Sequence, residues 1–311
     1  MSDLNNPIFH DAEKARVWLE SQLWPRGPVC PHCGTVDQAT LMGGETTRPG
    51  LYNCNACREP FTVTVKTLYE RSHIPLNKWL MATHLLMASK KGMSTRQISR
   101  MLGVSVKSAW FMMHRIRESL PPVKGEPMGG EGKTVEADET YVGGKEKNRH
   151  KSKRFKTHAG GTWGKEIVFS LVERKGTVRS LHLPSVTAAT LRPILVEQLN
   201  SKTKLMTDDA GQYRQMNRDF QHEVVNHGAG EYVRGGAHTN TVENYFSILK
   251  RGITGTYHHV SQQHLKRYLG EFDYRYNERM GLGVSDAARM EKSIKGIAGK
   301  RLTYRRIGGH A

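Results

Sequence analysis

The sequence predicts an α/β protein in which a mixed five-stranded sheet with helices follows two smaller N-terminal domains. Three observations predict this organisation. Two Cys-x-x-Cys pairs lie near the N-terminus, two short helical patterns joined through a glycine come next, and strand and helix patterns alternate from residue 134 onward. With 311 residues, of which 37% are hydrophobic, the chain is long enough to bury a sizeable core in two or three domains.

The cysteine pairs predict a metal site in residues 1–70. The chain has four cysteines, Cys30 and Cys33 in C-P-H-C and Cys54 and Cys57 in C-N-A-C. Each pair brings two thiolates to one point, and four thiolates complete the tetrahedral shell that zinc prefers. With all four as ligands, the site is closed and structural, with one zinc per chain. Two disulfides are a weaker alternative, because the rest of the chain resembles a cytosolic protein and paired Cys-x-x-Cys knuckles are an unusual bridge pattern.

Helical patterns come before and after this segment. Residues 13–24 have the apolar spacing of a helix. Residues 52–65 are predicted to form a strand, a cysteine knuckle and a second strand. In the domain predicted over 71–120, one amphipathic helix covers 76–89. Ser94 then caps a short helix that ends at Gly103.

Ser105 caps a second short helix, and two helices joined through a glycine turn are typical of a helix-turn-helix. Its second helix would contact DNA. The candidate contacts are Lys107, Ser108, Trp110, Phe111, Arg115 and Arg117. The alternative is a plain helical hairpin whose basic residues are only solvated.

A linker rich in proline and glycine is predicted over 121–133, followed by a catalytic domain over 134–282 and a basic tail over 283–311. Strands are expected at 134–142, 165–174, 177–183, 204–209 and 221–227. A helix is expected at 187–199, and helices dominate from about 239 to 279.

From residue 134 the predicted order is three antiparallel strands, a helix, a parallel strand, a helix and a fifth strand. This order describes the ribonuclease-H-like fold. In that order Asp138 lies on the first strand, Asp208 at the end of the fourth, and Glu243 on the helix after the fifth. Because the first and fourth strands are adjacent, these carboxylates would converge at one edge of the sheet. They repel one another unless cations neutralise them, and hard oxygen ligands suit two Mg²⁺ or Mn²⁺ ions.

Each carboxylate has competitors nearby. Glu136 shares a strand face with Asp138, so it could orient a ligand, whereas Glu139 points away and could be a surface charge. Asp209 competes with Asp208, and Glu243 could be an ordinary exposed helix residue. His238 could lie near the metals or only orient its loop.

The charge predicts a polyanionic partner. Lys and Arg number 47 against 29 Asp and Glu, a formal net charge of +18, which favours nucleic acid first and an anionic membrane second. No apolar run approaches the roughly 18 residues of a spanning helix, and no secretory signal is visible, so a cytoplasmic protein without a membrane partner is expected. The basic segments 145–156 and 292–306 could be solvated or could hold phosphates.

Together these features resemble a bacterial insertion-sequence transposase of the DDE class that carries an N-terminal zinc ribbon. The motifs that carry the resemblance are V-E-A-D-E-T-Y-V-G-G-K, M-T-D-D-A-G-Q-Y and H-T-N-T-V-E-N-Y-F-S-I-L-K-R-G. The resemblance covers nearly the whole chain. It implies Asp138, Asp208 and Glu243 as the catalytic carboxylates, magnesium-dependent cleavage and joining of DNA strands at the element ends, and a homo-oligomer on double-stranded DNA.

Three other functions stay open. A non-catalytic zinc-ribbon and helix-turn-helix regulator explains the charge and the zinc, but it leaves about 180 C-terminal residues without a task. A nuclease of the same fold shares the metal site and lacks strand joining. A degenerate element is disfavoured, because all three carboxylates are present.

Overall fold

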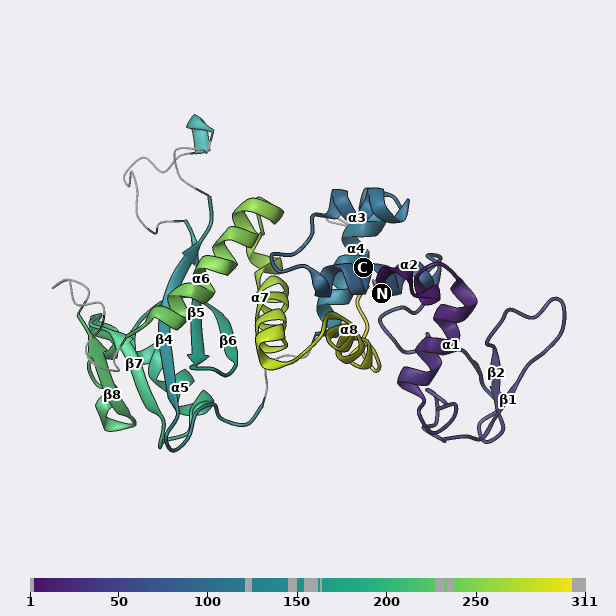
Figure 1. Cartoon of the computed structure of the whole chain (residues 1–311), viewed down its shortest axis with the longest axis horizontal. Helices are drawn as coiled ribbons and strands as arrows, with labels where there is room; N and C mark the ends of the chain where they lie inside the picture. The colour runs from purple at the N-terminus through teal and green to yellow at the C-terminus, as the bar shows by residue number, and fades with distance from the viewer. Residues whose placement is uncertain are drawn as a thin grey trace. The chain divides into compact units, whose positions relative to one another are not determined.

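The structure is a computed structural model that describes residues 3–120, 125–144, 150–153, 162, 164–226, 233 and 238–303 (Figure 1). The chain divides into two compact units. Unit 1 consists of Met1–Pro121 together with Glu278–Ala311, and unit 2 is Pro122–Asn277. The basic segment 145–156 falls mostly outside the described residues, as do the first part of the linker and the end of the C-terminal tail.

Unit 1 combines a small sheet with helices. Its helices are α1 (Ala12–Leu23), α2 (Leu76–Ala88), α3 (Thr95–Leu102), α4 (Val106–Ser119) and α8 (Asp286–Lys295). The antiparallel sheet has the order β1 (Ala39–Leu41), β2 (Tyr52–Cys54), β3 (Pro60–Phe61).

Side-chain caps set the helix starts in unit 1. Ser94 and Ser105 accept from the backbone N–H groups of Gln97 and Ser108, as the sequence predicts. Between α3 and α4, Gly103 has φ +60°, a left-handed conformation that glycine adopts without strain. The helix, turn and helix expected at 94–119 are therefore present, and α3 packs against both α4 and α2.

The C-terminal segment completes unit 1 rather than forming a separate tail. α8 packs against α1, α2 and α4 and buries Met290 and Ile294. After α8, the backbone N–H of Leu68 donates to the carbonyl of Ile297, and that of Gly299 donates to the carbonyl of Lys66. The structural division at 277/278 lies five residues before the predicted boundary at 282/283.

Unit 2 contains a five-stranded mixed sheet with the order β6-β5-β4-β7-β8. Its strands are β4 (Thr134–Val142), β5 (Glu166–Glu173), β6 (Val178–Leu183), β7 (Lys204–Asp208) and β8 (Gln221–Val225). β4, β5 and β6 pair antiparallel, whereas β7 is parallel to both β4 and β8. This is the predicted strand order, and it is consistent with a ribonuclease-H-like domain.

Helices cover both faces of this sheet (Figure 1). α5 (Ala188–Gln198) packs on one face, in a core that includes Val135 and Ala137 of β4. α6 (Asn240–Gly252), which continues into a π-helical turn (Ile253–Tyr257), and α7 (Gln262–Asn277) cover the other face. The odd residues of β4 therefore face α5, and the even residues face α6 and α7.

The connection from β7 to β8 differs from the predicted helix. It holds two 3₁₀ turns, Gly211–Tyr213 and Met216–Arg218, which bury Tyr213 and Met216 against the α5 face. Residues 209–220 must bridge two parallel strands and also bury these two side chains. That length is near the lower limit of a parallel crossover, and here 3₁₀ turns fill it in place of an α-helix.

Candidate active site and zinc centre

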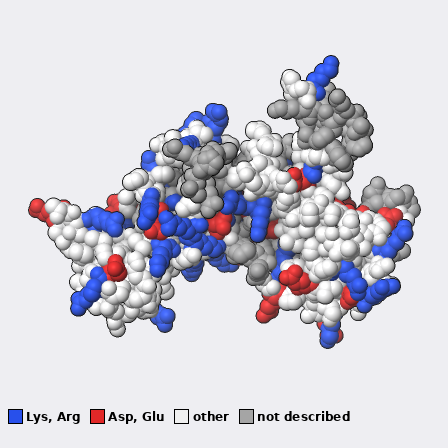
Figure 2. Space-filling model, turned by 180° about the vertical axis from the view of Figure 1, so that it is seen from behind, with Lys and Arg blue, Asp and Glu red and all other residues white. Residues whose placement is uncertain are grey.

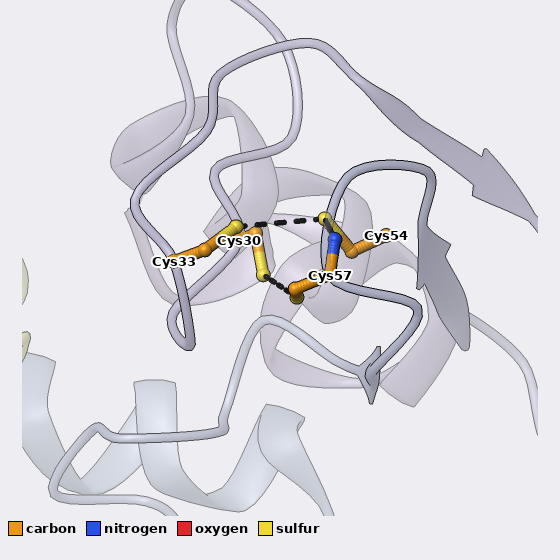
Figure 3. A group of neighbouring side chains, drawn as sticks. All are labelled: Cys30, Cys33, Cys54 and Cys57. Atoms are coloured by element: carbon orange, nitrogen blue, oxygen red, sulfur yellow. Dashed lines mark hydrogen bonds between the residues drawn. The ribbon is translucent and has the colours of Figure 1, made fainter.

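The four cysteines of unit 1 converge on one point (Figure 3). Sγ of Cys30 lies 3.6 Å from Sγ of Cys57, Sγ of Cys33 lies 3.6 Å from Sγ of Cys54, and all four sulfurs lie within 4.8 Å of one another. A tetrahedral zinc with bonds of about 2.3 Å requires sulfurs about 3.8 Å apart. The cluster therefore fits a structural zinc ion with four thiolate ligands.

Matching turns build the two halves of this cluster. The N–H of Gly34 donates to the carbonyl of Cys30, and the N–H of Arg58 donates to the carbonyl of Cys54, so each Cys-x-x-Cys pair curls around its own sulfurs. A hydrogen bond with the Thr35 hydroxyl lowers the pKa of Cys33 to about 6, which favours the thiolate that a metal binds.

Little else holds the ribbon together. Its aromatic cluster is small: Trp24 contacts Tyr52 and Phe61 edge-on, and these two rings stack on each other. A core of this size rarely stabilises a fold without a metal or disulfides. The metal is therefore expected to be part of the folded ribbon.

In unit 2, Asp138 and Glu243 line one pocket. Asp138 lies on β4 and Glu243 in the first turn of α6, and the pocket between them has a volume of about 380 Å³. The lining residues are Asp138, Glu139, Thr140, Glu243, Phe246, Ser247 and Lys250. Glu243, Ser247 and Lys250 follow helical spacing, so one exposed face of α6 forms this wall.

The carboxylates of unit 2 act on one another electrostatically. Burial, together with the negative charges of Glu139, Asp208 and Glu243, raises the pKa of Asp138 to about 7. Burial raises the pKa of Glu139 above its usual value, and the negative charge of Asp208 is a second cause. The residues predicted from distant parts of the sequence therefore share one negative region, in which a cation would relieve the repulsion.

Asp208 and Asp209 differ in environment. Asp208 ends β7, is half-buried, and its Oδ1 accepts from the N–H of Ala210 at 3.2 Å, whereas Asp209 is exposed. Among the described residues, the cysteine cluster alone brings three or more possible ligand atoms within 4.8 Å. The described carboxylates of unit 2 do not bring three ligand atoms that close together.

Glu139 is not the surface charge that strand alternation suggests. It does point away from the face of Asp138, but it is half-buried and accepts two hydrogen bonds of 2.6 Å, from Gln212 Nε2 and the Tyr213 hydroxyl. These bonds tie β4 to the connection that follows Asp208. Only the polar pair Gln212-Tyr213 in the motif M-T-D-D-A-G-Q-Y could have indicated this partner.

The family comparisons identify both regions. Residues 128–277 match the family model described as the ISXO2-like transposase domain, and residues 10–59 match the one described as the transposase zinc-ribbon domain. Together they cover more than half of the chain. The chain is a transposase with an N-terminal zinc ribbon. All the unit 2 carboxylates described above lie inside the first match, and all four cysteines lie inside the second.

A relative of this transposase occurs in an archaeon. It is the uncharacterized protein in transposable element ISH50 of Halobacterium salinarum, which is 28% identical over 278 residues, or 86% of this chain and 91% of the relative. Because that organism is archaeal, the bacterial origin that the resemblance implies stays a prediction.

The predicted DNA-contact residues of α4 in this transposase fall into two groups. Lys107 is exposed, and Ser108 and Trp110 are half-exposed in the first turns. Further along the helix, Arg115 is half-buried, and its guanidinium donates to the carbonyls of Glu70 and Leu302 at 3.1 and 3.2 Å.

Arg117 is only 3% exposed. We therefore correct the expectation for Arg117, because a buried side chain does not reach a DNA groove. Phe111, also a candidate contact, packs beneath the guanidinium of Arg115.

Positive charge gathers on unit 1. Figure 2 shows Lys and Arg side chains clustered on one face of this unit, with few acidic side chains among them. In the described part of the chain, no helix is long and apolar enough to cross a membrane.

Proposed function

We propose that this transposase binds the ends of its element through unit 1 and that unit 2 cleaves and joins DNA strands with two Mg²⁺ or Mn²⁺ ions. Asp138, Asp208 and Glu243 would hold the ions. The observation that carries the proposal is the shared field of these carboxylates beside an open pocket, which raises the pKa of Asp138 to about 7. In a transposase domain, such a cluster is best explained by cation binding.

When bound, the two ions supply charge neutralisation at the phosphate and activation of the attacking oxygen. The residues of the chain supply position. Asp138 comes from the centre of the sheet, Asp208 from the end of the neighbouring parallel strand, and Glu243 from the covering helix. Lys250 lines the same pocket and offers a cation for a DNA phosphate.

Unit 1 is suited to the binding step. The α3–turn–α4 arrangement exposes Lys107 at the start of its second helix, which is the part of a recognition helix that contacts bases. The positive face of unit 1 would neutralise the phosphates on either side. We also propose that a homo-oligomer forms on DNA, because an element has two ends and each needs a catalytic site.

Three substitutions test the catalytic assignment. Asp138→Asn, Asp208→Asn and Glu243→Gln keep the side-chain shape but remove the charge that holds a hard cation. Each should abolish Mg²⁺-dependent strand cleavage and joining while binding to the element ends persists. The measurement is a strand-transfer assay with labelled ends, combined with a gel-shift assay.

Asp209→Asn is the matched control, since Asp209 is adjacent to Asp208 but exposed. It should retain activity. Loss in Asp209→Asn with activity in Asp208→Asn would move the ligand to Asp209, and full activity in Glu243→Gln would contradict the three-carboxylate site. Cleavage by the wild type without any joining would favour the nuclease alternative.

A further inference from the structure

Among the described residues that lead into α6, no side chain caps the N-terminus of the helix. The first N–H groups of a helix lack intrahelical partners and need an acceptor. Thr239 occupies the cap position, but its hydroxyl donates to Oε1 of Glu243 at 3.0 Å and caps no N–H group.

A carboxylate from the central strand supplies the missing cap. Oε2 of Glu136 on β4 accepts from the N–H groups of Thr241 and Val242 at 2.7 and 3.0 Å. Its Oε1 accepts from the Thr241 hydroxyl at 2.8 Å. A negative charge at a helix N-terminus is also favoured by the helix dipole. A residue more than a hundred positions earlier therefore caps the helix that carries Glu243.

The same carboxylate is locked from the other side. Glu136 is 0% exposed, and Nε of Arg174 donates to its Oε1 at 2.6 Å. Nη2 of Arg174 donates to the carbonyl of His238 at 2.8 Å, just before α6 begins. The His238 ring nitrogen Nδ1 also lies 3.2 Å from Glu136 Oε1. Glu136 and Arg174 together fix both the entry to α6 and its first turn.

The Glu136–Arg174 pair connects the two elements, β4 and α6, that carry Asp138 and Glu243. On β4, Glu136 is two residues before Asp138 on the same face of the strand. On α6, the capped N–H of Val242 is adjacent to Glu243. A change in the reach of the Glu136 side chain would therefore move Glu243 relative to Asp138.

We infer that Glu136 is a positioning residue, which holds α6 against β4 at the separation that Asp138 and Glu243 need to share bound cations. The inference rests on the proposed function. It differs from a purely structural role, because a residue that only stabilises the fold would leave the cation affinity of the folded protein unchanged.

Two substitutions separate the effect of the length of the Glu136 side chain from the effect of its charge. Glu136→Gln keeps the length but loses the charge, and its single oxygen cannot replace both carboxylate acceptors. Glu136→Asp keeps the charge but is shorter by one methylene. Glu173→Gln is the matched control: Glu173 lies on neighbouring β5, opposite Val135, and pairs with Lys133 rather than with α6.

Three measurements are made on the full-length protein. Hydrogen exchange should be faster at the amides of Thr241 and Val242 in both Glu136 variants. Calorimetric titration with Mn²⁺ alone should show an affinity about 10- to 100-fold lower, the usual cost of losing a group that orients metal ligands. Strand joining should fall by a similar factor, with zinc content and DNA binding unchanged. Glu173→Gln should match the wild type throughout.

Wild-type Mn²⁺ affinity in either Glu136 variant would overturn the inference. So would losses that only follow the fraction of unfolded protein, as measured by circular dichroism at the assay temperature. A wild-type protein that binds no Mn²⁺ at this site would contradict the proposed function and this inference with it. A wild type that binds Mn²⁺ but joins no strands would contradict the proposed function alone.

Discussion

At the scale of single residues, Asp273 on α7 shows how unit 2 uses a buried acid for architecture. It is 1% exposed, its Oδ2 accepts from the N–H of Ser180 at 2.8 Å, and its Oδ1 accepts from the hydroxyls of Ser180 and Tyr245. These bonds join α7 and α6 to β6. Burial raises the pKa of Asp273 to about 6, so the folded protein binds this proton more tightly than the unfolded chain does.

This pKa predicts a pH-dependent stability. Because the folded pKa lies above the unfolded value of 3.8, the folded protein holds this proton more tightly. The contribution of Asp273 is therefore greatest below about pH 4 and is lost as the pH rises to about 6. A shift of about 2 units corresponds to about 3 kcal/mol. Asp273→Asn should remove this slope in urea titrations across pH 4–7.

Asp219→Asn provides a control of opposite sign. Arg192 bonds Asp219 and lowers its pKa, so that carboxylate stabilises the protein at neutral pH and loses its effect in acid. If the free energy of unfolding changes equally with pH in the wild type and in Asp273→Asn, the buried carboxyl is not the source of the pH dependence.

The role of a residue could be predicted where the alternation of side chains along a strand determines it. The role could not be predicted where a partner from a distant segment determines it. The alternation of β4 places Glu136 on the face of Asp138, and the strand order brings Asp208 beside it. The same alternation could not show that Glu139 meets Tyr213, since a residue that points away from one face still meets the chain covering the other. Arg117 has helical spacing that suits a DNA contact, but packing within unit 1 buries it.

At the scale of elements, α4 divides into an outward first part and an inward second part. Lys107→Ala should weaken binding to the element end about tenfold more than binding to random DNA, if the side chain reads a groove, because base contacts provide discrimination. The melting temperature should not change, since Lys107 is exposed. Competition gel shifts at fixed salt measure this ratio, and an equal loss on both DNAs would assign Lys107 to a phosphate.

Arg115→Ala is the comparison from the same helix. It frees the carbonyls of Glu70 and Leu302, so it should lower the melting temperature rather than the discrimination between DNAs.

The zinc ribbon gives a second prediction at this scale. Cys54→Ser should lower the zinc content from about one ion per chain and unfold the ribbon, because its core is small. Elemental analysis measures the metal. His32→Ala is the control: His32 lies within the first knuckle but is exposed, and the variant should keep its zinc. Full zinc in Cys54→Ser would exclude the four-cysteine site.

Element boundaries were predicted well in the sheet and less well at its connections. Runs of β-branched and apolar residues locate β4 to β7 within about one residue, because strand propensity and burial coincide there. The β7–β8 connection consists of 3₁₀ turns that bury Tyr213 and Met216. The sequence did not predict these turns, because the burial of the two side chains depends on the folded sheet.

At the scale of the whole molecule, unit 1 is discontinuous in sequence, since unit 2 is inserted between α4 and α8. The basic composition of 283–311 predicted a tail, but the apolar spacing of Met290, Ile294 and Ile297 provides a buried face. The net charge predicts the partner class and not where the last helix packs.

Two neighbouring substitutions test this arrangement. Ile294 is 0% exposed and Lys295 is exposed, so aspartate at each position places a carboxylate on α8 in opposite environments. Ile294→Asp should destabilise unit 1 by roughly 4 kcal/mol or more, because it buries an unpaired charge, and DNA binding should be lost with it. Lys295→Asp should fold normally. Thermal melts and gel shifts measure both, and similar melting temperatures would show that α8 does not support unit 1.

The order of synthesis follows from the same insertion. A ribosome releases α1 to α4 early, but Met290, Ile294 and Ile297, which complete their core, leave the exit tunnel only after all of unit 2. A chain whose translation stops before residue 278 therefore carries the carboxylates without a finished unit 1, the proposed DNA-binding unit. Interrupted translation would yield fragments unable to occupy the element ends, so they would not compete there with full-length transposase.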